Sequence, residues 1–350
     1  MTTTLVTGVT PPHAHPFWRR ALLTREAAVI GLLAIVIVVA LAVVPNFDSP
    51  LTVTYMLREI APILLIALPM TLIIITEEID LSVASVVGLS SVLTGMFVQA
   101  GLPLPVAAVL AIAGGAVCGA INGFLVTVVG LPSLAVTIGS LALFRGIAVG
   151  LLGTAAVTDF PEFWTDLAKA NIPGTPIPGV MIPFLVLAIV FAVVLHATPF
   201  GRALYAIGLN KEAAHFAGID VARSKFTLFV LSGAMAAFAG VYFTLDYGSA
   251  RGQNAMGMEL QIIAAVLLGG VSIFGGRGAL HGVIAGVLLI GTLSRALQIA
   301  GVSSAVINII TGVLLILSVI SAAVLAGARS RREAALGRRR QLRERAKLPT

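Results

Sequence analysis

Few side chains in this 350-residue sequence have the types and spacing that catalysis requires. The phosphate-binding pattern GxxxxGK[ST] and the zinc-binding pattern HExxH are both missing from it. The one cysteine, Cys118, lies in an apolar run, where we interpret it as a packing residue. His196, His215 and His281 are dispersed at the edges of apolar segments. Because a nucleophile needs a neighbouring base, this distribution predicts a chain that hydrolyses nothing by itself.

Polar side chains inside apolar segments are the next candidates for chemistry. Arg145 lies in the middle of SLALFRGIAVG, and Arg295 lies in the outer part of GTLSRALQIAG. A charge in hydrocarbon is costly, so such residues face protein or water. One hypothesis is that Arg145, Arg295 and Asn122 line a pathway for a hydroxylated or anionic solute. The alternative, which we favour for the two arginines, is that they snorkel or pair with carboxylates such as Asp246 or Glu259.

The acidic segment Thr76–Ser82, which reads TEEIDLS, allows two interpretations. Asp80 precedes Leu81 and Ser82 and is an ordinary N-cap for the helix that follows, at a cytoplasmic boundary. The competing hypothesis is that the carboxylates couple transport to an ion. We favour the capping role, and the pattern assigns no role to Glu77 and Glu78.

The segment Thr198–Lys225 is the most informative polar interruption. Asn210 is a good helix N-cap, and Gly218 is a good residue just past a C-terminus. The enclosed Lys211–Ala217 is therefore predicted to be a helix of about two turns. Its small-residue face consists of Ala213, Ala214 and Ala217, and the basic residues of the segment are Arg202, Lys211, Arg223 and Lys225. A short basic helix between long apolar segments indicates that a cytoplasmic partner docks on it.

Composition identifies the elements that must position these side chains. The chain is 58% hydrophobic and 11% charged, with a mean hydropathy of +1.06. A soluble domain of this length would precipitate, so the sequence predicts an all-α polytopic membrane protein. Nine of the 22 basic residues follow Ala328. Such a tail is typical of a topology determinant and an anionic-lipid contact, so we expect no nucleic-acid partner.

About ten transmembrane helices are predicted, because a bilayer core requires about 20 apolar residues per helix. The candidate runs are Ala27–Val44, Ile60–Thr76, Leu81–Val98, Leu104–Val129, Ser133–Gly153, Val180–His196, Phe226–Asp246, Leu260–Phe274, Ala279–Ile299 and Val302–Ala326. Several of these runs are short. The second or third run could be a broken or half-length segment, since three acidic residues separate them.

The basic residues predict the orientation of the chain. With the N-terminus inside, ten crossings place 17 of the 22 basic residues and both termini in the cytoplasm, and the acidic loop Thr154–Gly179 outside. The chain then divides into a cytoplasmic segment (1–26), a transmembrane domain (27–326, with a cytoplasmic loop at 198–225) and a basic cytoplasmic tail (327–350). The start of the chain also resembles a signal peptide, but its apolar run is long for one, and we retain it as the first helix.

Two glycine ladders predict close helix packing. Glycines at four-residue spacing line one helix face with no side chain, so that another backbone can approach. The two ladders are Gly115, Gly119 and Gly123, and Gly278, Gly282 and Gly286.

Four ordered motifs resemble the permease subunits of bacterial sugar ABC importers. The motifs are IDLSVASVVGLSS, AINGFLVTVVGLPSLAVTIGSLALFRGIA, GRALYAIGLNKEAAHFAGIDVARSKFTLFVLSGAMAAFAG and AAVLLGGVSIFGGRGALHGVIAGVLLIGTL. The resemblance covers about Leu51 to Ile320 and is strongest to the group that imports ribose, xylose, rhamnose and autoinducer-2. In these relatives glycine is more usual where this chain has Glu77 and Glu78, so no role is carried over to those positions.

The resemblance implies a permease of the bacterial inner membrane that works as a homodimer or with a related permease. It implies a periplasmic sugar-binding protein that delivers the solute, and a separate ATPase subunit that binds ATP and Mg, so that this chain holds no cofactor. The short helix would be the coupling helix that docks into the ATPase. The expected coupling residues are Gly201, Arg202, Asn210, Glu212, Ala213, Ala214, Ala217 and Gly218.

We therefore expect the permease subunit of an ATP-driven importer for a monosaccharide or related polyol-rich solute. Two alternatives stay open. One is transport of nucleosides or branched-chain amino acids within the same family. The other is an ion-coupled secondary transporter, which would need buried carboxylates or unwound helices near the midplane.

Overall fold

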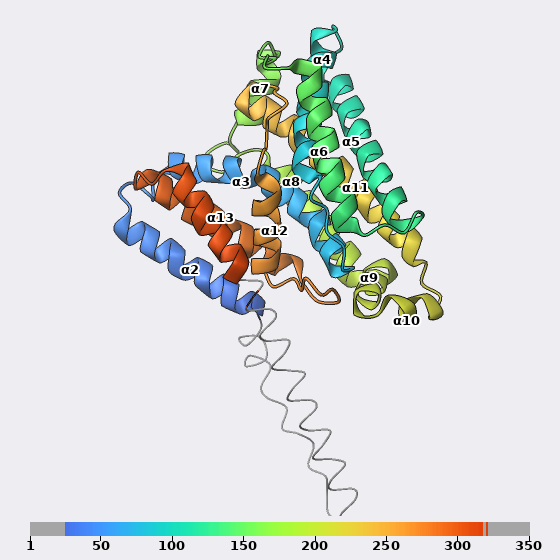
Figure 1. Cartoon of the computed structure of the whole chain (residues 1–350). Coiled ribbons are helices and arrows are strands. Elements are labelled where there is room, and N and C mark those ends of the chain that lie inside the picture. Colours follow the sequence, from blue (N-terminus) through green and yellow to red (C-terminus); the bar gives the residue numbers. More distant parts are fainter. Residues whose placement is uncertain (1–24, 318–319, 321–350) are drawn as a thin grey trace, which may run out of the picture.

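The computed structural model describes residues 25–317 and residue 320, and these are helical apart from loops and two isolated β-bridges. The helices are α2 (Arg25–Val43), α3 (Pro50–Ile75), α4 (Val83–Gln99), α5 (Leu104–Thr127), α6 (Ser133–Leu152), α7 (Glu162–Lys169), α8 (Met181–Ala197), α9 (Pro199–Leu209), α10 (Lys211–Phe216), α11 (Val221–Tyr247), α12 (Met258–Leu268), α13 (Leu280–Ile299) and a last helix, Ser304–Leu317. In Figure 1, α7 lies at one end of the molecule, and α9 and α10 lie at the opposite end. The all-α class is confirmed, whereas the basic tail and most of the N-terminal segment lie outside the described residues.

The membrane-spanning helices agree with the predicted runs more closely in position than in length. Six helices (α2, α3, α5, α6, α11 and α13) are long and apolar enough to cross a bilayer, and α8 with α9 makes a seventh if this bent pair is one span. The other three predicted runs coincide with the shorter apolar helices α4, α12 and Ser304–Leu317. The chain therefore has several helices that can span a membrane. That the three shorter helices also cross the membrane stays a prediction.

Two helices differ from their predicted bounds for identifiable reasons. α3 begins at Pro50 rather than Ile60, because its polar residues have partners within the protein. Arg58 forms an ion pair with Asp246 of α11, and the Glu59 carboxylate accepts a hydrogen bond from the side chain of Gln298. α12 ends at Leu268 because the chain then turns through Gly270, whose φ of +98° favours glycine.

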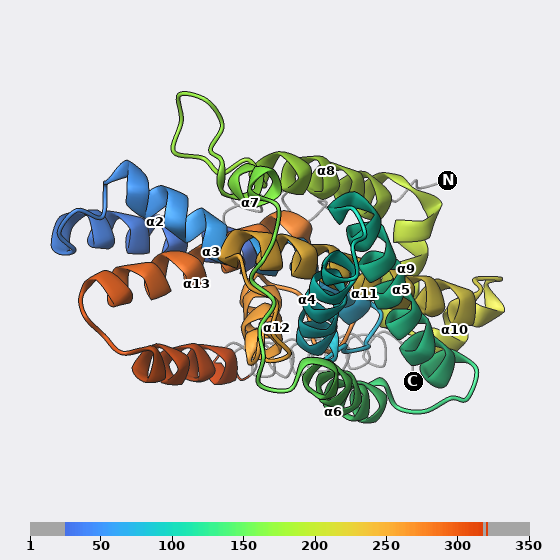
Figure 2. The same cartoon turned by 90° about the horizontal axis from the view of Figure 1, so that it is seen from above.

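Helices α3 and α11 form the inner part of the bundle, as the view from above shows (Figure 2). In the most apolar 18-residue segment of each helix, the buried share is 89% in α3 and 72% in α11. The corresponding shares are 11% in α2 and 28% in α6. Pro62 and Pro69 lie inside α3, where neighbouring helices surround the backbone. The apolar outer faces of α2, α5, α6 and α8 remain exposed and are suited to contact lipid tails.

The first glycine ladder allows α5 and α11 to cross at close range. A Cβ atom at Gly119 would lie 2.1 Å from the carbonyl oxygen of Phe229, and one at Gly115 would lie 2.5 Å from that of Gly233. The second ladder places Gly282 and Gly286 of α13 against the backbone of α12 in the same way. Gly278 precedes α13 and is not part of that helical face. The prediction of close packing is otherwise confirmed.

We expect Gly119→Ala to destabilise the folded protein by about 1–3 kcal/mol, because the new methyl group would force α5 away from α11. A matched control is Gly139→Ala in α6, where a Cβ atom would meet nothing within 4 Å. There the helix propensity of alanine predicts a neutral or stabilising change of up to about 1 kcal/mol. Thermal unfolding of the two variants in detergent measures the difference. Equal unfolding temperatures would contradict the proposed crossing.

Candidate functional site

The chain turns sharply after α8 and forms two short helices at one end of the molecule (Figure 1). α8 and α9 meet at an angle of 67°. The Thr198 hydroxyl oxygen caps α9 by accepting a hydrogen bond from the backbone N–H of Gly201 at 3.2 Å. Gly201 is required at this corner, because a Cβ atom there would lie 2.0 Å from the carbonyl oxygen of Leu195.

Helix α10 is the short helix that the sequence predicts. The Asn210 side chain caps it by accepting a hydrogen bond from the backbone N–H of Ala213 at 2.8 Å. The helix ends at Phe216, one residue before the predicted end. Gly218 follows in the left-handed conformation with φ of +84°, as expected for a residue just past a helix C-terminus.

The small-residue face predicted for α10 is not a single exposed face. Ala214 is buried in the chain's own core, whereas Ala213 and Ala217 are exposed. Among the large hydrophobic residues that the structure describes, Phe216 is the most exposed, at 89%. Other exposed members of the predicted coupling set are Arg202, Asn210, Glu212 and Gly218. The outward surface of α10 is therefore centred on an aromatic residue that the sequence analysis passed over, and Ala214 holds the helix against the protein.

Helix α9 fixes α10 to the rest of the bundle. The Tyr205 hydroxyl donates a hydrogen bond to the carbonyl oxygen of Gly278 at 2.7 Å. Gly208 packs so closely that a Cβ atom would lie 1.8 Å from the carbonyl oxygen of Ile75, which also accepts the N–H of Gly276 at 2.8 Å. The end of α3, the end of α9 and the loop before α13 are thus joined at one point.

An ion pair links the acidic segment to α11 beside α10. The Lys225 ammonium contacts the Glu78 carboxylate, and the two side chains are 8% and 15% exposed. Both residues line a groove of about 640 Å³ that also contacts Phe216. Glu77 adopts φ of +64°, a conformation that costs an ordinary residue about 1–2 kcal/mol and that glycine adopts freely. The structure thus gives Glu78 a partner, whereas it provides no structural explanation for glutamate at position 77.

The remainder of the acidic segment enters a buried polar network. Asp80 accepts hydrogen bonds from the backbone N–H and hydroxyl of Ser82, at 3.0 and 2.6 Å, and from the Ser232 hydroxyl at 2.9 Å. Asn122 donates to the Ser82 hydroxyl at 2.8 Å and accepts from Ser140. The predicted N-cap role of Asp80 is wrong, because the N-cap of α4 is Ser82; Asp80 accepts the backbone N–H of Ser82, is 1% exposed and does not lie at an open boundary. Asn122 is fully buried in this network.

Arg145 holds a loop in place. It donates to the carbonyl oxygens of Gly252 at 2.6 Å, Asn254 at 2.7 Å and Ala84 at 2.9 Å. The hydrogen-bond partners of Arg145 are therefore three backbone carbonyls, because the loop after α11 approaches α6 at this point. Of the two expected carboxylates, Glu259 interacts with Arg145 electrostatically. Asp246, one of the expected partners, binds Arg58 instead.

Arg295 lies beside an aromatic ring and an amide. Its guanidinium carbon is 5.5 Å from the centre of the Tyr55 ring, a cation–π arrangement, and its Nη1 donates to Gln298 at 3.4 Å. Gln298 in turn donates to Glu59 at 3.1 Å. Arg295 thus orients side chains around a cavity without lining it.

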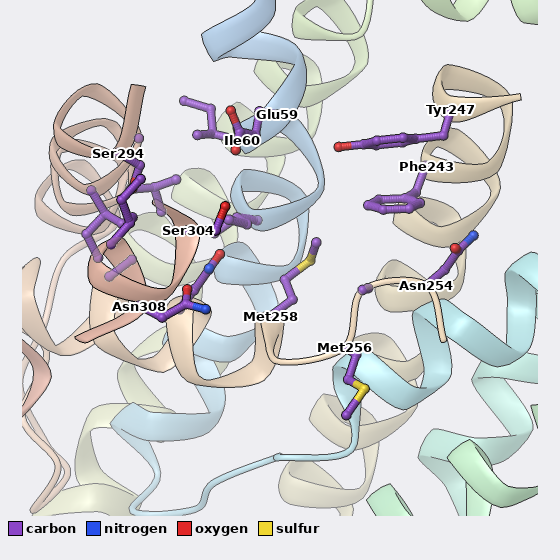
Figure 3. Close-up of a pocket in the computed structure, with 18 of the residues that line it drawn as sticks. Glu59, Ile60, Phe243, Tyr247, Asn254, Met256, Met258, Ser294, Ser304 and Asn308 are labelled. Carbon is purple, nitrogen blue, oxygen red and sulfur yellow. The ribbon is translucent and has the colours of Figure 1, made fainter. Parts of the chain in front are cut away.

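A second cavity lies at the ends of α11 and α13 that are away from α10, and its volume is about 620 Å³ (Figure 3). Its lining comes from α3, α11, α12, α13, the helix at Ser304 and the loop that Arg145 holds. None of Arg145, Arg295 and Asn122 is among the lining residues. The polar residues that do line it include Gln253, Asn254, Gln261 and Asn308, which the sequence analysis missed. For Gln261 and Asn308 the available signal was an amide within an otherwise apolar run, whereas Gln253 and Asn254 lie in a polar loop that gave no such signal.

These features define a multi-spanning helical protein with a polar-lined cavity between its helices, and comparison with known proteins identifies its class. Residues 52–328 match the family described as "Branched-chain amino acid transport system / permease component". The chain is 34% identical over 291 residues to the autoinducer 2 import system permease protein LsrD of Salmonella paratyphi A, covering 81% of this chain and 86% of that protein. It is 36% identical over 283 residues to LsrD of Escherichia coli O157:H7, covering 79% and 85%.

The chain belongs to this family of transport-system permease components. It is accordingly a multi-pass protein of the bacterial inner membrane, and its helices long enough to span a bilayer agree with that location. The resemblance read from the four motifs is confirmed.

Proposed function

We propose that this chain is the membrane subunit of an ATP-driven ABC importer that moves a monosaccharide or related polyol-rich solute into the cell. Membership of the permease family and similarity to an autoinducer 2 import permease support this function. One structural observation carries it furthest: a short helix, α10, lies at one end of the bundle with a phenylalanine 89% exposed. An exposed aromatic anchor on a fixed helix is typical of a docking surface.

The proposed partner at α10 is a nucleotide-binding ATPase subunit, which would bind ATP and Mg in its own chain. The proposed partner on the opposite side is a periplasmic sugar-binding protein. A second permease copy or a related permease would pair with this chain within the membrane. Co-purification after mild solubilisation, followed by mass identification of the retained proteins, tests the assignment. Retention of an ATPase supports it, and a preparation that reproducibly lacks one contradicts it.

The proposed orientation places both termini and α10 in the cytoplasm and Thr154–Gly179 in the periplasm. Its support is the charge asymmetry together with the separation of α7 and α10 to opposite ends (Figure 1). It requires ten crossings, including the three short apolar helices. We expect a phosphatase that works only in the periplasm to be active within Thr154–Gly179 and inactive after Thr350. Activity after Thr350 would contradict the ten-span topology.

Ion-coupled transport is the second candidate, and the burial of Asp80 is the observation that favours it. Both of its carboxylate oxygens already accept hydrogen bonds from serines, which indicates a structural role. Among the described residues, no group of three or more acidic, histidine or cysteine side chains is arranged to hold a metal ion. ATP-driven import therefore remains the preferred proposal.

A further inference from the structure

We propose that the cavity of about 620 Å³ binds one uncharged polyhydroxylated solute, and that Arg145 positions part of the cavity wall. This inference rests on the proposed function and adds to it a site, its residues and the chemical class of its ligand. The cavity lies at the end of the bundle opposite α10, where a solute delivered from outside would enter.

The cavity lining is suited to hydroxyl groups. Eight of the lining side chains are neutral amides or aliphatic hydroxyls, against two ionised side chains, Glu59 and Arg251. An amide offers both donors and an acceptor, and a hydroxyl donates and accepts, so both match a sugar hydroxyl. The two charged groups already have neutral partners, because Glu59 accepts from Gln298 and Arg251 donates to Ser249 at 3.1 Å. Neutral hydrogen-bonding groups thus outnumber the charged groups in the lining, which favours an uncharged solute with many hydroxyls.

An aromatic platform forms one wall of the cavity. Phe243 and Tyr247 stack in the last turns of α11, with ring centres 4.4 Å apart and an angle of 19° between the rings. Figure 3 shows this pair opposite Ser304 and Asn308, with Glu59 between them. A flat apolar face combined with surrounding amides fits a ring that carries C–H groups on its faces and hydroxyls at its edge.

A strap, defined as residues 248–257, carries lining residues across the cavity, and Arg145 fixes it. Arg145 binds the carbonyl oxygens of Gly252 and Asn254, on either side of Gln253, and the carbonyl of Ala84 anchors the same guanidinium to α4. The Asn254 amide nitrogen donates to Ser91 and to the strap itself, which leaves its Oδ1 as the acceptor available to a solute. Arg145 is therefore a positioning residue.

The test uses the chain with its co-purified partners in proteoliposomes and radiolabelled ribose, xylose, rhamnose and leucine. Wild type should take up at least one sugar and not leucine. Gln261→Leu and Asn308→Leu should each lower the initial uptake rate of that sugar about fivefold, the loss expected for one hydrogen bond. Gln99→Leu, an exposed glutamine at the end of α4, is the matched control and should leave uptake unchanged.

The outcomes separate this inference from the proposed function. If the wild-type protein takes up none of the solutes in the presence of ATP, the proposed function is wrong, and the inference that depends on it is wrong as well. Sugar uptake that both cavity variants leave unchanged overturns the inference alone. Uptake of leucine in place of the sugars overturns the ligand class.

The positioning role of Arg145 has its own readout. With Cys118→Ala as background, Gln253→Cys places one thiol on the strap. Arg145→Met should raise the rate at which a water-soluble maleimide labels that thiol several-fold, and Arg145→Lys should restore a rate close to wild type. An unchanged labelling rate in Arg145→Met would overturn the positioning role.

Discussion

Phe216→Asp is expected to release the ATPase from the purified complex and to abolish ATP-dependent uptake. Phe216 is 89% exposed and makes no contribution to the core of this chain, so its replacement leaves the fold intact. If it anchors a partner, its loss costs about 2 kcal/mol or more, which weakens docking about thirtyfold. The measurement is the amount of ATPase retained per permease after affinity purification.

The matched control is Phe163→Asp, which replaces another exposed phenylalanine, 68% exposed, in α7 at the opposite end of the molecule. This variant should retain the ATPase at the wild-type level. Ala214 is unsuitable for the same test, because it packs inside the chain and a large residue there would displace α10 directly. Full ATPase retention by Phe216→Asp would show that α10 is only a connector.

Lys225→Met is expected to destabilise the protein by about 3 kcal/mol, because it leaves the Glu78 carboxylate, 15% exposed, without its cation. The same change loosens the attachment of the acidic segment to α11, next to α10. Thermal unfolding in detergent measures the loss. Arg223→Met, which removes an exposed ion pair with Asp220, should change stability by no more than about 0.5 kcal/mol.

The exchange variant, Glu78→Lys with Lys225→Glu, tests whether the loss of stability in Lys225→Met comes from the missing ion pair or from the change of a buried side chain. Restoring opposite charges should recover most of the stability that Lys225→Met loses. If the exchange variant is as unstable as Glu78→Lys alone, the pair does not act through its charges.

Much of the fold could be predicted because apolar runs and caps are local signals. The bounds of α5, α6 and α13 follow from continuous apolar runs, and Asn210 and Gly218 mark α10 through their backbone preferences. The start of α3 could not be predicted, since Arg58 and Glu59 are tolerated inside it only through partners about 190 and 240 residues away in the chain.

The candidate site was predicted less completely, because side-chain direction depends on packing. The small-residue face predicted for α10 gave no indication that Ala214 is buried and Phe216 is exposed. The sequence marked Arg145 and Arg295 as candidate pathway residues. In the structure they hold residues of the cavity wall in place, Arg145 through the loop after α11 and Arg295 through Gln298. The cavity itself combines residues from five helices and one loop, which no local sequence pattern brings together.

Uptake into proteoliposomes that contain the purified complex tests ATP-driven import most directly. Either ATP is supplied on the side of the membrane that carries α10, or a proton or sodium gradient is imposed. We expect ATP with Mg to drive accumulation of a monosaccharide on the opposite side of the membrane from the added solute, and a non-hydrolysable ATP analogue to give none. We also expect no accumulation from an ion gradient alone. Accumulation driven by a proton or sodium gradient in the absence of ATP would contradict the assignment as an ABC importer permease.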